Sequence, residues 1–260
     1  MCIPWKNYQI MSDSINFNIG IVVPCYNEAN RISIPSFEQD IIEYKNHFYC
    51  FVNDGSSDNT LAILKEFAEK YPLQIEVLNN AHNMGKAETV RNGINFLHAK
   101  NNFDIIGFLD ADLATPLEEV ERIAFVFNDP RKLFVFGSRI MHMGGNIHRK
   151  FIRFVLGRMF ATVVSVWILK TPIYDTQCGF KFFRPSIIPI IFSNPFKSKW
   201  FFDIELFCKS IQHFSTQQIN EIAQEFFLQK WDDVKGSKIK LSDYFKVPFE
   251  LLKLKSNYKL

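Results

Sequence analysis

The sequence predicts an α/β protein built on a doubly wound, mostly parallel, Rossmann-like sheet. Two observations predict this fold class: short apolar runs of strand length recur along the first half, and amphipathic helical patterns lie between them. Strict alternation of strands and helices is typical of parallel sheets with helices on both faces. We expect a single domain over residues 1–260, with halves at 15–140 and 141–240, the second less regular, and an amphipathic tail at 241–260.

Five apolar runs are the candidate strands of the first half. Each is short and continuous, as a buried strand should be: Ile19–Val23 (ended by Pro24), His47–Val52, Ile75–Leu78, Ile105–Leu109 and Leu133–Phe136. Helices are expected between them, with apolar faces at Leu61, Leu64, Phe67 and Ala68, and at Ala87, Val90, Ile94 and Leu97. A further helix is expected near Pro116, because a first helical turn tolerates proline. The second half predicts a helix over 148–170 and a late strand over 221–228.

Composition disfavours several classes of protein. Hydrophobic residues make up 47% of the chain, which is enough for a large core and argues against disorder. The net charge of +3 is too small to indicate a nucleic-acid-binding protein, so no nucleic-acid partner is expected. The five cysteines are scattered and form no CxxC pair, which predicts free thiols in a reducing compartment and no zinc site.

No segment of the sequence predicts a membrane-spanning helix. The first residues lack the apolar core of a signal peptide. The longest apolar stretch, Phe151–Leu169, is interrupted by Arg153 and Arg158. We therefore expect a cytoplasmic protein that is either soluble or attached to a membrane surface.

Polar clusters follow the predicted strands that end at Val23, Val52, Leu109 and Phe136. The carboxyl ends of parallel strands meet at one edge of a sheet, which is where such sheets bind their ligands. The clusters therefore predict a single site. The sequence contains neither GxGxxG after the first strand nor GxxxxGK[ST], which disfavours a dinucleotide fold and P-loop chemistry.

Asp110 and Asp112 end the fourth predicted strand. Because side chains alternate along a strand, both carboxylates would point to the same side. Two neighbouring anions are unfavourable unless a cation lies between them, and a hard ion such as Mg²⁺ or Mn²⁺, bound also to substrate phosphates, suits that position. Taken alone, the same pair fits a turn with two solvated aspartates better than a metal site, so the surrounding motifs decide the interpretation.

Those motifs resemble family-two inverting glycosyltransferases with the GT-A fold. The matching segments of the first half, in the family's order and spacing, are PCYNE at 24–28, NDGSSD at 53–58, NMGK at 83–86, DAD at 110–112 and GSR at 137–139. In the second half, DTQCGFK at 175–181, WFFDIE at 200–205 and GSK at 236–238 resemble the dolichyl-phosphate β-glucosyltransferase branch. The resemblance covers roughly Ile19 to Lys240.

The resemblance implies a nucleotide-sugar site in the first half. It assigns the nucleotide pocket to Pro24, Tyr26, Asn27 and Glu28, and a hydrogen bond with uracil to Asp54. It places Asp110 near the ribose, the diphosphate and the metal, and makes Asp112 the main metal ligand.

Lys86 begins a predicted helix, where a cation is unfavourable unless an anion lies nearby. We therefore include it among the residues that bind the nucleotide sugar. A solvated surface lysine is the alternative interpretation.

The acceptor implied by the resemblance is a polyprenyl phosphate. A lipid monophosphate needs little activation, since its second ionisation lies near pH 6, and it must mainly be held and neutralised. Arginine suits that role through bidentate contacts, so Arg139, Arg149 and Arg153 are the candidates for the acceptor phosphate. Alternatively, Arg149 and Arg153 face solvent or lipid headgroups.

Asp175 is a catalytic candidate together with Asp112 and Arg139. It would orient the acceptor phosphate or an arginine, or act as a base; a helix cap or turn is the structural alternative. Asp203 and Glu205 follow aromatic residues and fit structural pairing with a basic residue as well as they fit contact with sugar.

The expected function is transfer of a hexose, glucose from UDP-glucose, to a polyprenyl phosphate with a divalent metal. Three alternatives stay open: a surface polysaccharide or other glycan as acceptor, GDP-mannose as donor, and a non-catalytic nucleotide-sugar-binding scaffold. The helix over 149–170 and the tail near 245–254 are similar to interfacial amphipathic helices. They predict peripheral attachment at the inner face of the membrane. The oligomeric state is left open.

Overall fold

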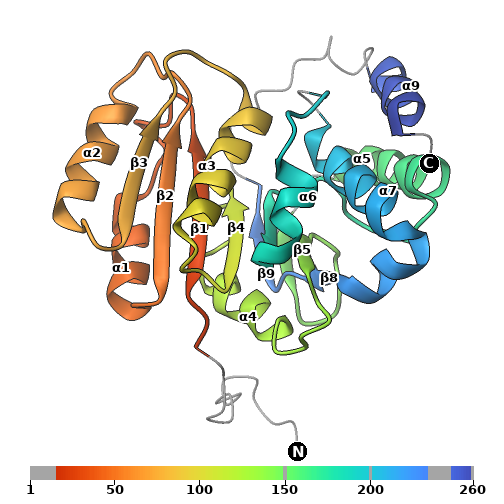
Figure 1. Ribbon diagram of the computed structural model, residues 1–260, viewed down its shortest axis with the longest axis horizontal. Helices are drawn as coiled ribbons and strands as arrows, with labels where there is room; N and C mark the ends of the chain where they lie inside the picture. The colour runs from red at the N-terminus through yellow and green to blue at the C-terminus, as the bar shows by residue number, and fades with distance from the viewer. Residues whose placement is uncertain (1–15, 149–150, 199–200, 234–246, 259–260) are drawn as a thin grey trace, which may run out of the picture.

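The computed structural model describes residues 16–148, 151–198, 201–233 and 247–258, without side chains at 151–153 and 247. Its centre is a seven-stranded sheet in the order β3-β2-β1-β4-β7-β5-β8 (Figure 1). The strands are β1 Ile19–Cys25, β2 His47–Asn53, β3 Ile75–Asn79, β4 Ile105–Leu109, β5 Phe134–Ser138, β7 Phe180–Phe183 and β8 Ala223–Phe227. All neighbouring pairs are parallel except those of β7, which runs antiparallel to both β4 and β5.

A smaller parallel pair and the helices complete the described fold. The pair consists of β6 Asn146–His148 and β9 Lys230–Asp232. The α-helices are α1 Ile34–Glu43, α2 Thr60–Lys70, α3 Lys86–Lys100, α4 Glu118–Val126, α5 Phe151–Val163, α6 Ile188–Phe192, α7 Phe202–Ile222 and α9 Val247–Tyr258. A π-helix, η2 Val164–Leu169, continues α5, and a 3-10 turn, η3 Pro185–Ile187, precedes α6.

The helices cover both faces of the sheet, and each face has its own hydrophobic cluster. Successive side chains of β1 point to opposite faces of the sheet. Val22 belongs to the cluster on the side of α3 and α7, whereas Ile21 and Val23 belong to the cluster on the side of α1, α2 and α4. Helices η2, α6 and α9 join the α3 side. In Figure 1, α2 and α9 lie at opposite ends of the molecule.

The predicted fold class is confirmed, and three local predictions need correction. The first strand does not stop at Pro24 but continues to Cys25; this is tolerated because β4 pairs with β1 only as far as Val22, so no ladder bond is lost on that side. The predicted helix over 148–170 is described from Phe151 and changes to π geometry at Val164. Strand β7 was not predicted, since its FKFF sequence lies inside a segment read as polar.

The topology brings several loops to one edge. Because β1 lies between β2 and β4, the chain order reverses there, and the loops after these strands flank that switch point. Because β7 is antiparallel, the loop that precedes it, rather than the one that follows, reaches the same edge. No helix among the described residues is long and apolar enough to cross a bilayer.

Candidate functional site

The loops after β1 and β2 are bonded to each other. Asn27 has a left-handed backbone (φ 51°), and its Oδ1 accepts a hydrogen bond from the Ser57 amide at 2.9 Å. The Asn27 amide donates to Ser56 Oγ at 3.0 Å, and the Glu28 amide donates to Thr60 Oγ1 at 2.8 Å. Tyr26 is exposed, whereas Glu28 is buried. These hydrogen bonds hold the two loops together, so the residues predicted to form the nucleotide pocket, including Pro24 near the end of β1, lie on adjoining segments.

Asp54 is buried and ties a third loop to this edge. Its carboxylate accepts hydrogen bonds from the amides of Met84 (2.8 Å) and Gly85 (3.0 Å) and from Asn80 Nδ2 (3.1 Å). These bonds hold the start of α3 against the loop after β2, and from there Lys86 reaches Asp110 at the end of β4. The contact with uracil stays a prediction; the structure adds a loop-holding role for the same side chain.

The two aspartates after β4 each face a cation. Lys86 Nζ lies 2.5 Å from Asp110 Oδ1, and both side chains are about two-fifths exposed, at 38% and 42%. Arg31 Nη2 lies 3.2 Å from Asp112 Oδ2, and the amide of Ala114 donates to Asp112 Oδ1 at 3.2 Å. Arg31 was missed in the sequence, although its position just after the PCYNE motif could have indicated it.

The pKa of Lys86 is raised above its ordinary value. Although the side chain is partly exposed, the loss of water around its ammonium group would by itself lower this pKa. The charges of Asp110 and two further aspartates, and the hydrogen bond to Asp110, raise it by more. Lys86 therefore stays a cation at neutral pH. A fixed cation beside partly exposed carboxylates suits a ligand that carries both negative charge and a metal ion.

Gly179 allows the loop before β7 to touch Asp110. A Cβ at this position would lie 2.1 Å from Asp110 Oδ2, so any side chain would collide with the carboxylate. This close approach explains the glycine in the DTQCGFK motif. It also brings the DTQCGFK motif of the second half into direct contact with the DAD motif of the first.

Arg139 and Asp175 form a bidentate pair. Arg139 Nε donates to Asp175 Oδ2 at 2.6 Å, and Nη2 donates to Oδ1 at 2.8 Å. The guanidinium lies 5.4 Å from the centre of the Trp231 ring. Burial acts to lower the pKa of Arg139, but the charge and hydrogen bonds of Asp175 outweigh it and raise this pKa. Asp175 thus orients an arginine, one of the roles foreseen for it.

Glu225 on β8 supports this pair and was not singled out in the sequence. Its carboxylate accepts hydrogen bonds from the amides of Tyr174 (2.9 Å) and Asp175 (2.7 Å). Burial raises the pKa of Glu225, and these hydrogen bonds partly oppose the shift. The sequence predicts a strand around Glu225 but not this role, because only the order of strands in the sheet brings β8 beside the loop that contains Asp175.

Lys181 and Asp203 form a buried ion pair behind the site. Lys181 is fully buried on β7, and its Nζ lies 2.5 Å from Asp203 Oδ1 and 2.5 Å from the Cys178 carbonyl oxygen. Next to Asp203, the ring of Phe202 lies 5.8 Å from Lys86 Nζ. The start of α7 therefore lies beside the predicted diphosphate position. Asp203 pairs with a basic residue, which is one of the two alternatives left open for it.

The remaining candidates are distributed differently. Glu205 pairs with no cation among the described contacts; it accepts hydrogen bonds from the amides of Lys197 and Ser198 (both 2.8 Å) and from the Tyr258 hydroxyl (2.5 Å). Arg149 and Trp200, with residues 236–238, lie outside the described residues, and Arg153 is described without its side chain. The predicted roles of Arg149 and Arg153 toward the acceptor phosphate stay predictions.

The carboxylates of Asp110 and Asp112 fit a divalent ion. Among the described residues, no group of three or more His, Cys, Asp or Glu side chains could hold a metal alone. Mg²⁺ is usually held by one or two carboxylates together with substrate phosphates and water, and Mn²⁺ accepts the same oxygen donors. This donor set therefore suits an ion that arrives with a diphosphate.

Comparison with known proteins identifies the enzyme class. The family model described as "Glycosyl transferase family 2" matches residues 20–189. Dolichyl-phosphate beta-glucosyltransferases are similar along nearly the whole chain. One from Trichomonas vaginalis is 31% identical over 97% of this chain and 77% of the relative; one from Saccharomyces cerevisiae is 31% identical over 93% and 75%; and the Homo sapiens enzyme is 30% identical over 87% and 71%.

Solved structures share the fold at low sequence identity. The glucosyl-3-phosphoglycerate synthase of Mycobacterium tuberculosis, solved with Mn²⁺, UDP-glucose and phosphoglyceric acid, has a TM-score of 0.63 at 14% identity, covering 94% of this chain and 80% of that one. A Pyrobaculum calidifontis mannosyltransferase, solved with GDP-Man and Mn²⁺, has a TM-score of 0.58 at 16% identity, covering 93% and 64%. The resemblance inferred from the motifs is thereby confirmed: the chain belongs to glycosyl transferase family 2, has the GT-A fold and is a glycosyltransferase.

Proposed function

We propose that this enzyme transfers glucose from UDP-glucose to a polyprenyl phosphate, with inversion at the anomeric carbon. The proposal is supported by the similarity to dolichyl-phosphate β-glucosyltransferases over 97% of the chain, which includes the second half. The observation that carries it is the contact of the DTQCG loop with Asp110, since this contact puts Arg139 and Asp175 beside the donor residues.

The residues proposed to bind the donor would together stabilise the negative charge of the UDP leaving group. A divalent ion, Mg²⁺ or Mn²⁺, held by Asp110 and Asp112 would supply Lewis-acid stabilisation of the diphosphate. Lys86 keeps its charge at neutral pH and lies within reach of the same position. Because negative charge grows on the diphosphate as the glycosidic bond breaks, a fixed lysine lowers the barrier by stabilising that charge in the transition state. Pro24, Tyr26, Asn27, Glu28 and Asp54 would bind the nucleotide.

The acceptor residues position a nucleophile that is already ionised. A phosphate monoester is largely dianionic at neutral pH, so the new bond from its oxygen to the anomeric carbon forms without a general base as UDP leaves. Arg139 uses Nε and Nη2 for Asp175, and a guanidinium has five N–H donors. We expect Nη1 to contact the phosphate, with Asp175 holding the guanidinium plane. Arg149 and Arg153 would add charge.

The test is a transfer assay with labelled nucleotide sugars and short-chain polyprenyl phosphates. The expected product is a labelled glycolipid from UDP-glucose in the presence of Mg²⁺ or Mn²⁺. Label from GDP-mannose would change the sugar. Label incorporated only into a phosphate-free glycan would overturn the acceptor and require a carboxylate base. Donor binding without any turnover would favour a scaffold.

The proposed acceptor is a membrane lipid, so we also propose that the enzyme works at the inner face of a membrane. The glycan, mannose and scaffold alternatives named in the sequence analysis remain outcomes of the assay.

A further inference from the structure

An exposed apolar face lies at the end of the molecule that carries α9. Eight large apolar side chains there are between 38% and 70% exposed. They are Val155, Leu156, Met159, Val163, Val166 and Trp167 on α5 and η2, and Phe249 and Leu252 on α9. On α5 and η2 their spacing follows one side of a helix, while Val164 and Ile168 on the other side are buried in the core.

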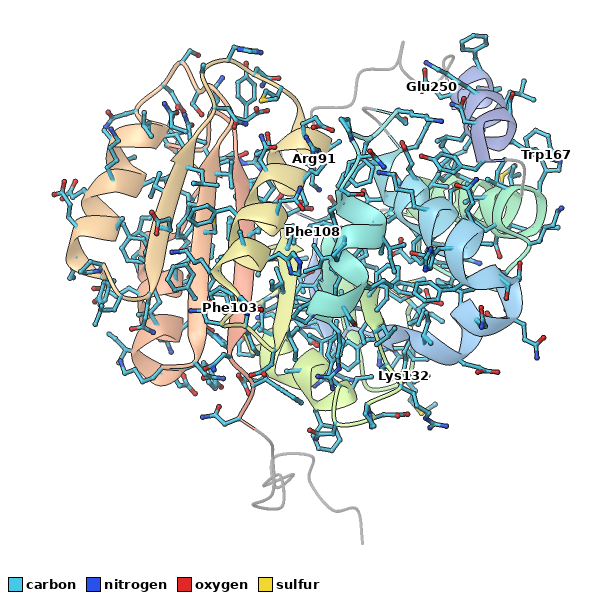
Figure 2. All side chains as sticks on the ribbon, viewed as in Figure 1. Arg91, Phe103, Phe108, Lys132, Trp167 and Glu250 are labelled. Atoms are coloured by element: carbon cyan, nitrogen blue, oxygen red, sulfur yellow. The ribbon has the colours of Figure 1, made fainter. Side chains whose placement is uncertain are left out.

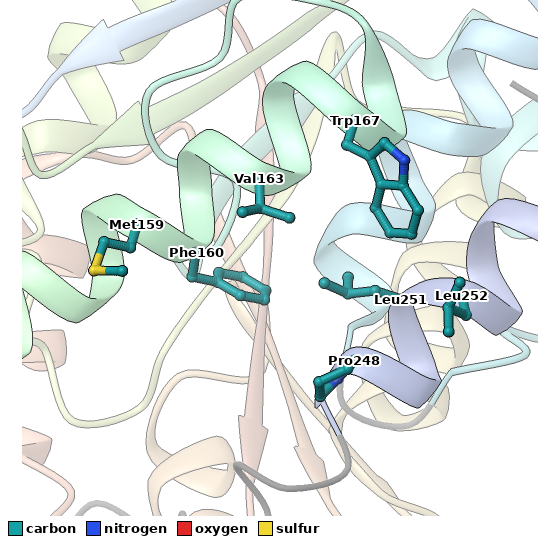
Figure 3. Close-up of a pocket in the computed structure, with 7 residues that line it drawn as sticks. All are labelled: Met159, Phe160, Val163, Trp167, Pro248, Leu251 and Leu252. Atoms are coloured by element: carbon teal, nitrogen blue, oxygen red, sulfur yellow. The ribbon is translucent and has the colours of Figure 1, made fainter.

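A groove separates the two parts of this apolar face. Its volume is about 350 Å³, and its walls are Met159, Phe160, Val163 and Trp167 on one side and Leu251 and Leu252 on the other (Figure 3). Figure 2 shows Trp167 and Glu250 at this end of the molecule, far from Phe103. Apolar patches of this kind in a soluble protein mark interaction surfaces.

The charges around the apolar face are positive. Between Phe151 and Lys170 the sequence has no acidic residue. Lys170 and Lys253 are exposed, and Lys255 Nζ lies 4.1 Å from the centre of the Trp167 ring. The single acidic residue of α9, Glu250, accepts a hydrogen bond from Ser198 Oγ at 3.3 Å. Apolar side chains bordered by lysines are typical of surfaces that lie on anionic lipid.

The apolar face is connected to the site by direct contacts. Phe160, in the groove wall, stacks on Phe201 at 5.4 Å, and Phe201 precedes the residues that contact Lys86 and Lys181. Arg158 Nη1 donates to the Tyr174 carbonyl oxygen at 2.6 Å, one residue before Asp175. A lipid held at this face would therefore be beside the residues proposed to bind its phosphate.

We propose that the face formed by α5, η2 and α9 docks on an anionic lipid bilayer. The apolar side chains and the groove accept hydrocarbon, and Lys170, Lys253 and Lys255 lie among the headgroups. A second copy of this chain is a poorer occupant, because two such faces would bring like charges together. The inference rests on the proposed function for its biological purpose, but it is measured by binding alone.

The test is co-sedimentation of the full chain with two kinds of vesicle, phosphatidylcholine alone and phosphatidylcholine with phosphatidylglycerol in equal parts. We expect binding to the anionic vesicles that weakens as salt is added. The variant Val166→Asp with Phe249→Asp should bind at least about tenfold more weakly, since it places two charges where hydrocarbon is expected. Lys170→Gln with Lys253→Gln should lose roughly thirtyfold on anionic vesicles only.

The matched control is Ile42→Asp with Leu73→Asp, two exposed apolar residues (58% and 89%). They lie in α1 and just after α2, helices on the side of the molecule opposite α9 (Figure 1). The control variant should bind like the unmodified chain. Equal binding by the Val166 and Phe249 variant, or equal loss in the control, would overturn the proposal. The proposal would also be overturned if light scattering showed a dimer that is lost only in the Val166 and Phe249 variant, because the face would then join two copies of the chain.

A second readout separates this inference from the proposed function. Val166 and Phe249 line neither the groove nor the site, so turnover with a short-chain, water-soluble polyprenyl phosphate should be unchanged in their variant. Vesicle binding without any transferase activity would remove the proposed function and leave the docking face intact. Transferase activity without vesicle binding would remove the docking face and leave the proposed function intact.

Discussion

Lys86 with Asp110, and Lys181 with Asp203, are the same kind of ion pair in two different surroundings. Both pairs have an N–O distance of 2.5 Å. The first lies at the edge of the sheet, with both side chains about two-fifths exposed. The second lies between β7 and α7, with Lys181 fully buried and Asp203 8% exposed. Burial, not geometry, separates them.

This difference indicates which charges can exchange partners. An exposed pair gains little stability, so its members can turn to an incoming diphosphate and metal at small cost. A buried pair cannot be separated without leaving an unpaired charge in the core. We therefore propose that the exposed pair serves binding and turnover and that the buried pair belongs to the framework that holds β7 and α7 in place.

The largest expected effect is on stability, from Lys181→Met. Methionine leaves the Asp203 carboxylate buried without its cation, which should lower the free energy of unfolding by about 3–5 kcal/mol. Urea unfolding followed by circular dichroism measures the change. Lys86→Met is the matched control and should lower the same free energy by less than about 1 kcal/mol while reducing turnover. Equal losses in the two variants would contradict the distinction drawn between the pairs.

Asp112→Asn should act on turnover and not on folding. Loss of groups that merely support metal ligands reduces activity 10–100-fold, so losing a ligand should reduce turnover at least about a hundredfold. The measurement is glycolipid formation at saturating UDP-glucose, with and without added Mn²⁺. Asp129→Asn, which changes a surface pair with Arg131, is the control. An unchanged rate would remove Asp112 from the metal site.

Arg139→Lys should affect the acceptor more than the donor. Lysine cannot reproduce the bidentate contact with Asp175, and one charged hydrogen bond contributes about 1.5–3 kcal/mol. Turnover with polyprenyl phosphate should therefore fall by about tenfold to a hundredfold. Slow hydrolysis of UDP-glucose in water should hardly change. If hydrolysis fell equally, Arg139 would serve the diphosphate and the acceptor assignment would be wrong.

The smallest effect concerns the buried His47, at the amino end of β2. Burial alone lowers its pKa, but hydrogen-bonding partners at both ring nitrogens raise it overall: Asp40 Oδ2 at 2.6 Å and Glu121 Oε1 at 2.8 Å. Tyr49 also donates to Asp40, and Tyr44 stacks on the ring. Because the folded pKa exceeds the unfolded one of about 6.5, the stabilisation is complete below that pH and is lost as pH rises through the folded pKa.

The free energy of unfolding can change by at most about 1.4 kcal/mol per pH unit through His47, since one proton is involved. Urea midpoints measured from mildly acidic to alkaline pH should therefore decline, and His47→Gln should flatten this decline. A decline of the same steepness in His47→Gln would assign the pH dependence to other groups. Turnover should not follow this titration, because His47 lies at the opposite end of β2 from the site.

Local patterns were enough to predict most of the donor half. The strands and helices up to β5 bury enough apolar surface in a regular period for the sequence to show them, as α3 illustrates with Ala87, Val90, Ile94 and Leu97 all buried. The DAD and NDGSSD motifs could be placed at strand ends for the same reason. Strand β7 was missed because its FKFF sequence contains a lysine and directly follows the polar DTQCG segment, although all four of its residues are buried.

The fold class, the family and the sheet edge proposed for the site could all be predicted from the amino-acid sequence, because they depend on local periodicity and on motifs with fixed spacing. Which charged side chains form pairs could be seen only in the folded chain. Arg31 lies 81 residues from Asp112, and Lys181 lies 22 from Asp203. Local sequence preferences cannot predict contacts between residues so far apart in the chain. The first contact follows from the parallel pairing of β1 with β4, which brings the loops after both strands to one edge. The second follows from the reversed direction of β7 and from the packing of α7 against it, and it leaves Asp203 buried while Asp110 stays partly exposed.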